Sequence, residues 1–252
     1  MIADQTRSWS DRNPDDCAVY TKGVHKAYRR GAAATPVLEG IDLAVDRGRC
    51  VYLAGPSGSG KTTLLSILGC ILSADQGTVR ILGEDVGSIG RDERTTLRRT
   101  RLGFVFQRFH LIRGLNAINN VCVPLVLQGL TRPKAQVRAM ALLEAVGLAD
   151  RAGVDPRNLS AGQCQRVALA RALAGDPELI LADEPTASLD AANGQEVMAL
   201  LKRLTVEQGK TAVVVTHDPR IFHFADRILH LENGRIMDRA EQPAAAMAAA
   251  GG

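Results

Sequence analysis

The hydrophobic pattern of the chain alternates between short apolar runs and longer stretches of helical spacing. Four runs predict buried strands: Arg49–Ala54, Leu102–Phe106, Leu179–Ala182 and Thr211–Val215. After the first run and a glycine-rich turn, apolar residues recur at helical spacing between Leu64 and Ile71. Strands that alternate with helices predict an α/β fold with a largely parallel sheet.

A second sheet is predicted before the glycine-rich turn. The segment Val37–Val45 has apolar residues at the alternate positions Ile41, Leu43 and Val45, which is typical of a half-buried strand. Several strand candidates lie in this early part of the chain, without room for crossover helices between them. We therefore expect an N-terminal antiparallel β subdomain packed beside the main sheet.

The middle of the chain is predicted to form an inserted α-helical subdomain at about residues 108–175. From about Asn116 to Leu173 the pattern is mostly helical. Proline removes a backbone donor and interrupts helices, so Pro124, Pro133 and Pro156 are expected breaks.

The two ends of the chain differ in composition from the domain between them. Residues 1–16 are polar and aperiodic, and residues 241–252 are nearly all Ala, Gly and Met. We predict a flexible segment at the first and a disordered tail at the second. The domain itself is expected to span residues 17–240.

Composition narrows the class of protein. Hydrophobic residues make up 46% and charged residues 23%, and the net charge of +4 is too small and too dispersed to indicate nucleic acid. The five cysteines form no metal-ligand spacing, which favours a reducing compartment. Neither a run of about 18 apolar residues nor a signal peptide is visible. We expect a cytoplasmic protein that reaches a membrane only through a partner.

The strongest chemical motif follows the first buried strand, and we term it the phosphate loop. It reads Gly55-Pro56-Ser57-Gly58-Ser59-Gly60-Lys61-Thr62. This matches G-x-x-x-x-G-K-[ST] between a predicted strand and a predicted helix, the context that the motif requires. Glycines let backbone N–H groups converge on phosphate oxygens. We expect Lys61 to reach the β- and γ-phosphates, Thr62 to bind Mg²⁺, and Thr63 to belong to the nucleotide-binding set.

Two adjacent acids end the third apolar run. Asp183 and Glu184 follow Leu179–Ala182. Carboxylates at the end of a buried strand are costly unless they face a cation or water. We expect Asp183 to hold Mg²⁺ and Glu184 to orient and polarise the attacking water. Together with the phosphate loop, these acids indicate a P-loop nucleoside triphosphatase, a description that several families share.

A further motif narrows the family. The signature segment, Leu159-Ser160-Ala161-Gly162-Gln163, is followed by Gln165 and Arg166 and then by a helix of small residues. This segment resembles the signature of the ABC ATPases. The order of motifs also resembles that family: phosphate loop, Gln107, signature, paired acids, Ser188-Leu189-Asp190 and His217. The resemblance covers roughly residues 18–239 and implies an ATP-hydrolysing domain.

The resemblance also implies that the active site is shared between two subunits. Ser160, Gly162 and Gln163 would meet the γ-phosphate of ATP held by the opposite subunit, where the start of a helix favours an anion. A homodimer with two ATP molecules in its interface follows. Asp190 would communicate between the two sites.

Three other residues receive roles from the resemblance. Gln107 would contact Mg²⁺ or the attacking water, and His217 would hydrogen-bond the γ-phosphate. Tyr28 would stack on adenine, a contact that selects weakly among flat bases.

Two positions in the signature region are unusual. Ala161 stands where the family more often has glycine, which is tolerable if the backbone there is helical. Cys164 lies at the start of the signature helix, where the positive helix end can favour a thiolate. We hypothesise that alkylation of Cys164 slows ATP hydrolysis.

Several stretches resemble one group of ABC exporters, those that release lipoproteins or export macrolides or glycolipids. They are Gly69-Cys70, Phe106–Leu111, Asn120-Val121, Val123–Leu125 and Thr216–Pro219. This implies a separate membrane permease, a location on the inner face of the membrane, and a lipid, lipoprotein, peptide or drug-like substrate. Fold-level analogy does not fix the substrate.

Two other classes compete with export. An ABC ATPase that acts on DNA or ribosomes would carry a coiled-coil insertion or a second ATPase domain, and neither is visible. A regulatory or mechanotransmission subunit of the cell-division type stays open as the alternative. A GTPase is disfavoured because no N-K-x-D motif is found, and a small-molecule kinase would not explain the signature segment.

Overall fold

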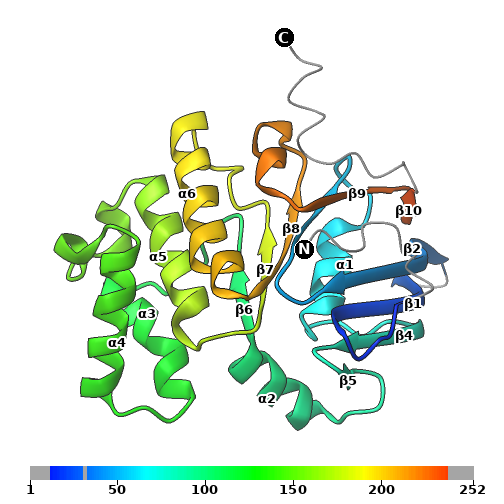
Figure 1. The fold of residues 1–252 in the computed structure, drawn as a ribbon, viewed down its shortest axis with the longest axis horizontal. Coiled ribbons are helices and arrows are strands. Elements are labelled where there is room, and N and C mark those ends of the chain that lie inside the picture. Colours follow the sequence, from blue (N-terminus) through cyan, green and yellow to red (C-terminus); the bar gives the residue numbers. More distant parts are fainter. Residues whose placement is uncertain (1–11, 31–32, 238–252) are drawn as a thin grey trace, which may run out of the picture.

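The computed structural model describes residues 12–30 and 33–237 (Figure 1). Most of the predicted flexible segment 1–16 and all of the predicted tail 241–252 lie outside these residues. The described chain forms a six-stranded sheet of order β10-β9-β3-β8-β7-β6 and a four-stranded sheet of order β2-β1-β4-β5. The predicted α/β class with two sheets is confirmed.

The six-stranded sheet contains the four predicted buried strands. Its members are β3 (Cys50–Ala54), β6 (Leu102–Val105), β7 (Leu179–Asp183), β8 (Thr211–Thr216), β9 (Arg227–Glu232) and β10 (Arg235–Met237). All neighbours pair in parallel except β10, which is antiparallel to β9. Ala54 pairs with Thr216, and Asp183 pairs with Val215. The carboxyl ends of β3, β7 and β8 therefore meet at one edge, and the residues that follow them lie together.

The four-stranded sheet is antiparallel, as predicted for the early part of the chain. It consists of β1 (Cys17–Arg30), β2 (Ala33–Asp46), β4 (Gln76–Ile81) and β5 (Glu84–Asp85). The last two strands follow the first helix, outside the early segment from which the sheet was predicted.

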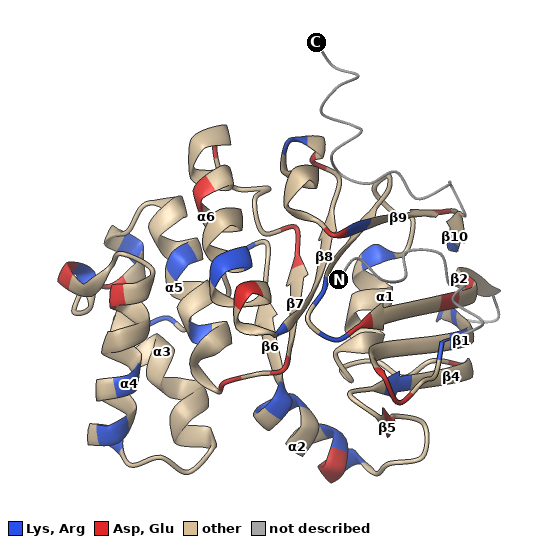
Figure 2. Cartoon of the chain, in the orientation of Figure 1, with Lys and Arg blue, Asp and Glu red and all other residues tan. Residues whose placement is uncertain are grey.

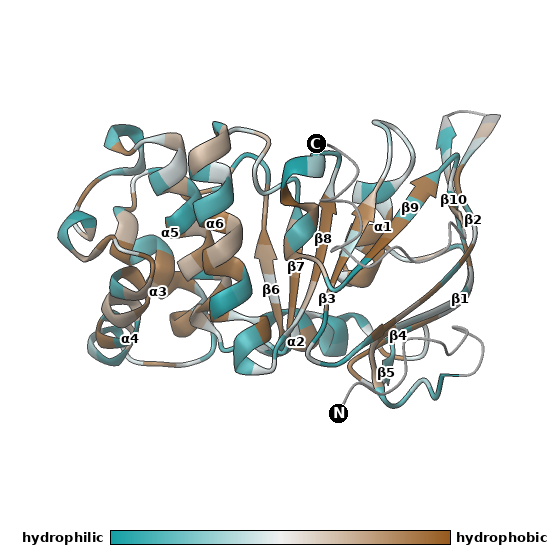
Figure 3. Ribbon diagram, turned by 45° about the horizontal axis from the view of Figure 1, so that its top comes forward, coloured by the Kyte–Doolittle hydropathy of each residue, from teal (hydrophilic) through white to brown (hydrophobic). Residues whose placement is uncertain are grey.

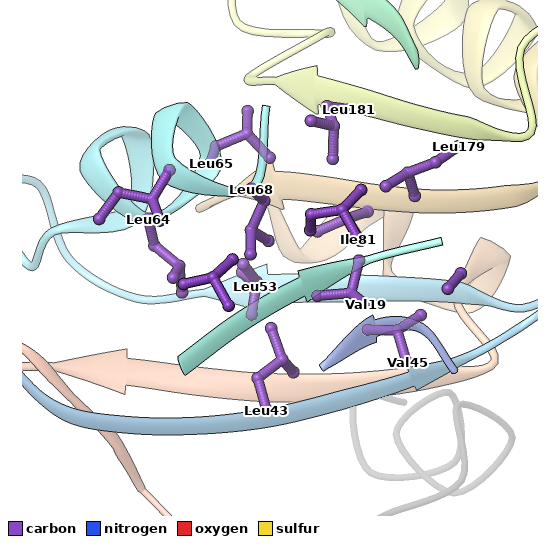
Figure 4. Packing of buried hydrophobic residues seen from close by; sticks show 14 of the residues in the cluster. Val19, Leu43, Val45, Leu53, Leu64, Leu65, Leu68, Ile81, Leu179 and Leu181 are labelled. Atoms are coloured by element: carbon purple, nitrogen blue, oxygen red, sulfur yellow. The ribbon is translucent and has the colours of Figure 1, made fainter. Parts of the chain in front are cut away.

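Helices cover both faces of the six-stranded sheet. Helix α1 (Lys61–Leu68) packs Leu64, Leu65 and Leu68 against one face, where they join Leu53 and Leu181 in a single apolar cluster (Figure 4). Helices α5 (Ala161–Ala174) and α6 (Ala191–Leu204) cover the opposite face. The central strands are hydrophobic along their length (Figure 3), as strands buried on both sides must be.

The helical subdomain is built from α3 (Ala117–Leu127), α4 (Arg132–Ala145) and the adjoining part of α5. Pro133 lies in the first turn of α4, and Pro156 in that of the short helix η3 (Pro156–Asn158). The prediction of a break at Pro124 is wrong, because this proline lies inside α3.

The packing of α3 explains why the helix continues through Pro124. Val121 and Leu125, on either side of the proline, are fully buried in the core of the subdomain. The Pro124 carbonyl still accepts a hydrogen bond of 3.0 Å from the Gln128 amide. Packing energy therefore outweighs the one backbone bond that proline removes.

The remaining helices are short or exposed. They are α2 (Arg91–Arg101), η2 (Ala149–Arg151), η4 (Val206–Gln208) and η5 (Pro219–Phe224). Helix α2 has Asp92 and Glu93 in its first turn and arginines in its last turn, which suits the helix dipole (Figure 2). Within residues 12–30 and 33–237, no helix has the length and apolar character needed to cross a bilayer.

Candidate active site

The phosphate loop turns from β3 into α1 along a path that requires glycine. The angle φ is +150° at Gly55 and +103° at Gly60. A Cβ atom on Gly55 would lie 2.1 Å from the Leu231 carbonyl oxygen, and one on Gly60 would lie 2.8 Å from the Val37 carbonyl oxygen. Gly60 is also the N-cap of α1 and has no side chain to occupy the first N–H groups of that helix. The loop thus offers a cradle of backbone donors at a helix N-terminus, which suits a phosphate group.

Two side chains of the loop are directed inward. Lys61 is 7% exposed, and its Nζ donates hydrogen bonds of 2.7 Å to the carbonyl oxygens of both Gly55 and Pro56. Burial lowers the pKa of Lys61, and the nearby carboxylates of Glu184 and Asp183 partly oppose that shift. The buried Ser59 hydroxyl has no hydrogen-bond partner within the described residues. A buried ammonium and a spare hydroxyl are groups that an anion would satisfy.

Thr62 and Asp183 meet at the edge of the sheet. The Thr62 hydroxyl donates to Asp183 Oδ1 over 3.2 Å, although 121 positions separate the two in sequence. Desolvation raises the pKa of Asp183, and the adjacent Glu184 adds to the rise, while the bond from Thr62 lowers it. Hydroxyl and carboxylate oxygens are the ligands that Mg²⁺ prefers, and this ion keeps several waters. The pair therefore fits Mg²⁺, although no cluster of three or more His, Cys, Asp or Glu residues is found in the described chain.

Glu184 and His217 form a second pair. His217 Nδ1 lies 2.8 Å from Glu184 Oε1 and follows the end of β8. Glu184 has φ of +47°, a conformation that non-glycine residues rarely adopt, and its amide donates to the Val215 carbonyl over 2.9 Å. Backbone strain of this kind is often found where a side chain must be directed into a site. The fold thus places a carboxylate and an imidazole beside the phosphate loop.

Gln107 and Tyr28 lie at the margins of this group. Gln107 is exposed and follows β6, and its carbonyl accepts a hydrogen bond of 3.3 Å from the Ser188 hydroxyl. Tyr28 is 48% exposed, and its hydroxyl lies 3.5 Å from the Thr63 hydroxyl. An exposed aromatic ring beside the start of α1 is available for stacking on a flat base.

The signature segment leads into α5 through a capping box. The Ser160 hydroxyl accepts from the Gln163 amide over 3.2 Å, and Gln163 Oε1 accepts from the Ser160 amide over 2.9 Å. Gly162 is buried, and a Cβ atom on it would lie 2.6 Å from Asn193 Oδ1. Asp190 caps α6, and its bonds from the Asn193 amide and side chain lower its pKa. The two helix starts are therefore packed together.

The signature segment and the phosphate loop belong to opposite sides of the main sheet. Helix α1 packs on one face and α5 on the other. Figure 1 shows the two helices separated by β6, β7 and β8. The structure brings together Lys61, Thr62, Asp183, Glu184 and His217, but it does not bring Ser160, Gly162 or Gln163 to them.

Comparison with known proteins decides the family. The sequence profile described as ABC transporter matches residues 38–187. The chain belongs to the ABC transporter family. A macrolide export ATP-binding/permease protein, MacB 1/2 of Paracoccus denitrificans (strain Pd 1222), is 46% identical over 216 residues, which are 86% of this chain. MacB of Escherichia coli (strain K12) is 45% identical over the same share.

The cassette is shorter than these relatives. Its matched region spans only 32% of the Paracoccus protein and 33% of the Escherichia protein. Both relatives are named as ATP-binding and permease proteins. The likeness therefore concerns about a third of each relative.

Solved ABC cassettes share the fold. The cassette MJ0796, solved as a dimer in a post-hydrolysis state with ADP and Pi, has a TM-score of 0.83 and 41% identity, over 90% of this chain and 98% of that one. CbiO1 from Clostridium perfringens, part of the ABC transporter complex CbiONQ, has a TM-score of 0.81 and 26% identity, over 93% and 92% of the two chains. The predicted ABC ATPase fold is confirmed, and ATP hydrolysis is the activity of this class.

The surroundings of Cys164 in this structure disfavour its thiolate form. Its thiol is 7% exposed and donates to the Pro156 carbonyl over 3.4 Å. Burial raises the pKa of Cys164, so the neutral thiol is favoured over the thiolate. Burial therefore acts against the thiolate that a helix start can favour, and the effect of alkylation stays a prediction. Ala161, by contrast, fits the expectation, because it is the first residue of the helix α5.

Sequence reasoning missed two polar residues of α5. Arg171 Nη1 and Nη2 donate to backbone carbonyls that follow Gln107, and Gln165 Nε2 donates to the carbonyl that follows Glu184. A signal was present for the first of them, because Arg171 is the one charged residue in the stretch 167–174. A lone arginine in an apolar helix requires acceptors, so its position predicts a contact.

Proposed function

We propose that this chain is the ATP-hydrolysing subunit of an ABC exporter, working as a homodimer beneath a separate membrane permease. The observation that carries the proposal is the convergence of the phosphate loop, the Thr62–Asp183 pair and the Glu184–His217 pair at one edge of the sheet. This is the set of groups that nucleotide binding, metal binding and water activation need.

The first step is the binding of ATP. The amides of the phosphate loop and the start of α1 would hold the phosphates, and Lys61 would exchange its two carbonyl acceptors for phosphate oxygens. Tyr28 would stack on adenine. Thr62 and Asp183 would hold Mg²⁺ together with Gln107, and the ion would neutralise charge on the phosphate oxygens.

The second step is the activation of water. Glu184 would orient the attacking water and accept its proton, since its carboxylate lies beside the phosphate loop at the end of β7. His217 already contacts Glu184 over 2.8 Å. His217 would hold this carboxylate and would donate to the γ-phosphate when ATP is present.

The third step needs a second copy of the chain. Ser160, Gly162 and Gln163 would act on ATP held by the partner, with Asp190 linking the two sites. The Ser160 hydroxyl accepts from Gln163 within the capping box and keeps its own proton to donate. The position of α5 on the face opposite α1 and the dimer formed by MJ0796 both support this arrangement.

Export through a permease is the finer part of the proposal. The names of the MacB relatives combine ATP binding with a permease, and about 45% identity favours export over a purely regulatory role. The cassette would then lie on the cytoplasmic face of the membrane, bound through the permease. A lipid, lipoprotein, peptide or drug-like compound is the proposed class of substrate.

The first test is the Glu184→Gln variant. We expect turnover to fall by about 100-fold or more, because the amide cannot accept the proton, while ATP binding is kept. The variant should accumulate as an ATP-bound dimer in size-exclusion chromatography. Glu144→Gln, on the exposed side of α4, is the matched control. Wild-type turnover in Glu184→Gln would show that another group activates the water.

The same variant tests the export proposal. Tagged Glu184→Gln purified with ATP from native membranes should retain an integral membrane permease, because the closed dimer is long-lived. Recovery of ribosomes, DNA or only soluble proteins would leave the ATPase chemistry in place and contradict export.

A further inference from the structure

Helix α5 carries two polar side chains toward the loops that bear Gln107 and Glu184. Gln165 is fully buried, and Arg171 is half-buried. Between them lie Arg166, which is partly exposed and pairs with Glu196, and the fully buried apolar stretch from Val167 to Ala170. Polar groups in such a helix need specific partners, so their contacts are informative.

Arg171 holds the segment that follows Gln107. Its Nη1 donates to the His110 carbonyl over 2.6 Å, and its Nη2 donates to the Phe109 carbonyl over 2.8 Å. Phe109 and His110 have φ of +59° and +47°, a left-handed conformation that L-residues rarely adopt because it is strained. A guanidinium with two donors directed at these carbonyls can hold a strained turn in place.

The environment of Arg171 strengthens this interpretation. Desolvation lowers the pKa of Arg171, which reflects the burial of its guanidinium, and a buried charged group needs acceptors such as these two carbonyls. On the other side of the turn, the rings of Phe106 and His110 lie 4.7 Å apart between centroids. The turn is thus fixed by a ring contact on one side and by α5 on the other.

Gln165 holds the segment that follows Glu184. Its Nε2 donates to the Pro185 carbonyl over 2.8 Å. Its Oε1 is buried and lacks a hydrogen-bond partner among residues 12–30 and 33–237. A buried acceptor without a partner is unfavourable, so the polar side chain gains from its Nε2 bond and not from its oxygen. The feature that an apolar residue would lose is the bond to Pro185.

The two loops are also bonded to each other. The Ser188 hydroxyl donates to the Gln107 carbonyl over 3.3 Å. The loop after β6, the loop after β7 and helix α5 therefore form a closed set of hydrogen bonds. The same helix begins at the signature segment.

We propose that Arg171 and Gln165 are positioning residues, through which α5 sets the places of Gln107 and Glu184 in the active site. The proposal rests on the ATPase function proposed above and assigns two residues that touch neither nucleotide nor metal. Its consequence is that the helix that begins at the signature segment also sets the places of the subunit's own Gln107 and Glu184.

The experiment compares Arg171→Lys and Gln165→Met with Arg138→Lys and Gln136→Met, two controls on the exposed side of α4. Lysine keeps the positive charge but lacks a guanidinium that can donate to two carbonyls at once. Methionine keeps the side-chain volume of glutamine but lacks the amide donor. We expect kcat to fall about 10-fold in each test variant, because small misplacements of reacting groups slow turnover strongly. The Kd for ATP should stay within about twofold of the wild-type value.

Hydrogen exchange of the nucleotide-free protein gives a readout that does not depend on hydrolysis. We expect faster exchange over residues 107–115 in Arg171→Lys and over residues 185–190 in Gln165→Met, with the phosphate loop unchanged. Unchanged exchange in both test variants would overturn the proposal, whatever their activity.

Further outcomes separate this proposal from the ATPase function. The proposal is wrong if the fall in kcat is proportional to a fall in the thermal midpoint, because the two residues are then merely structural. It is also wrong if the Kd for ATP rises by the same factor as kcat falls. Exchange that becomes faster only in the expected loops would support the positioning roles of Arg171 and Gln165. If the wild-type protein also failed to hydrolyse ATP, the proposed ATPase function would be contradicted separately.

Discussion

The phosphate-loop side of this cassette and its signature side are organised differently. On the first side, Lys61 donates hydrogen bonds to two loop carbonyls. Thr62, in α1, donates a hydrogen bond to Asp183 at the end of β7. On the second side, Ser160 and Gln163 bond each other in a capping box. The fold alone therefore assembles one half of the proposed active site, while the other proposed half is a well-capped helix start on the opposite face of the sheet.

This difference fits the proposal that one chain is stable but does not complete the active site by itself. The capping box satisfies donors at the start of α5, so the signature segment keeps its shape without a ligand. The same segment exposes Ser160 at the positive end of a helix. A second copy can add phosphate to this surface without refolding it, so the dimer is expected to form and open with the nucleotide state.

The largest expected effect comes from the phosphate-loop side. Lys61→Ala removes the ammonium that would bind the β- and γ-phosphates, and we expect turnover to fall by about 100-fold or more, together with weaker ATP binding. Equilibrium binding of ATP and steady-state hydrolysis measure the two effects. Lys134→Ala, on an exposed turn of α4, is the matched control and should behave as the wild type. Full turnover in Lys61→Ala would contradict the assigned site.

A mixed dimer tests directly whether each active site combines the phosphate loop of one subunit with the signature segment of the other. When Lys61→Ala stands in one subunit and Ser160→Ala in the other, one of the two shared sites keeps both residues. When both changes stand in the same subunit of a dimer with wild type, each site lacks one residue. We expect the first dimer to hydrolyse ATP about 10-fold faster than the second, because removal of one phosphate contact slows turnover strongly.

Faster turnover in the second mixed dimer would mean that each chain completes its own site, and equal turnover would contradict the shared sites. The loss of the Ser160 cap is expected to destabilise the protein by about 1 kcal/mol in both dimers. The comparison therefore cancels the effect on folding. A different affinity tag on each subunit allows each mixed dimer to be purified in two successive affinity steps.

The two sides also differ in how far the sequence predicted them. The phosphate loop and the strand end at Asp183 follow from local rules, because glycine placement and apolar runs act over a few residues. The predicted breaks show the limit of such rules. Pro124 lies inside α3 because Val121 and Leu125 are held by tertiary packing, which no local pattern reveals.

Contacts between distant segments were the least predictable part of the site. Nothing near Gln165 in the sequence indicates its bond to Pro185, which lies 20 positions away. The start of a helix can favour a thiolate at Cys164, but burial raises the pKa of this thiol and favours its neutral form. Local chemistry predicts which groups are present, and the packing of distant segments decides their ionisation and partners.

The smallest expected effect concerns the stability of the phosphate-loop side and its dependence on pH. Desolvation raises the pKa of Asp183 above its unfolded value of 3.8. The folded protein then binds more protons than the unfolded one in the window between these two pKa values, so this group lowers stability as pH rises through it. Above the raised pKa the ionised carboxylate destabilises the nucleotide-free fold fully. Asp183→Asn removes this charge and keeps an oxygen that accepts from Thr62.

We therefore expect Asp183→Asn to raise the urea midpoint of the nucleotide-free protein at pH 7 to 8. The advantage over wild type should shrink as pH falls through the raised pKa of Asp183. Asp150→Asn, which changes an exposed carboxylate paired with Arg151, is the control for removal of charge. A lower midpoint for Asp183→Asn at neutral pH would show that the carboxylate stabilises the nucleotide-free fold. In that case the phosphate-loop side would be assembled for stability as well as for catalysis, and the contrast with the signature side would be weaker than the geometry indicates.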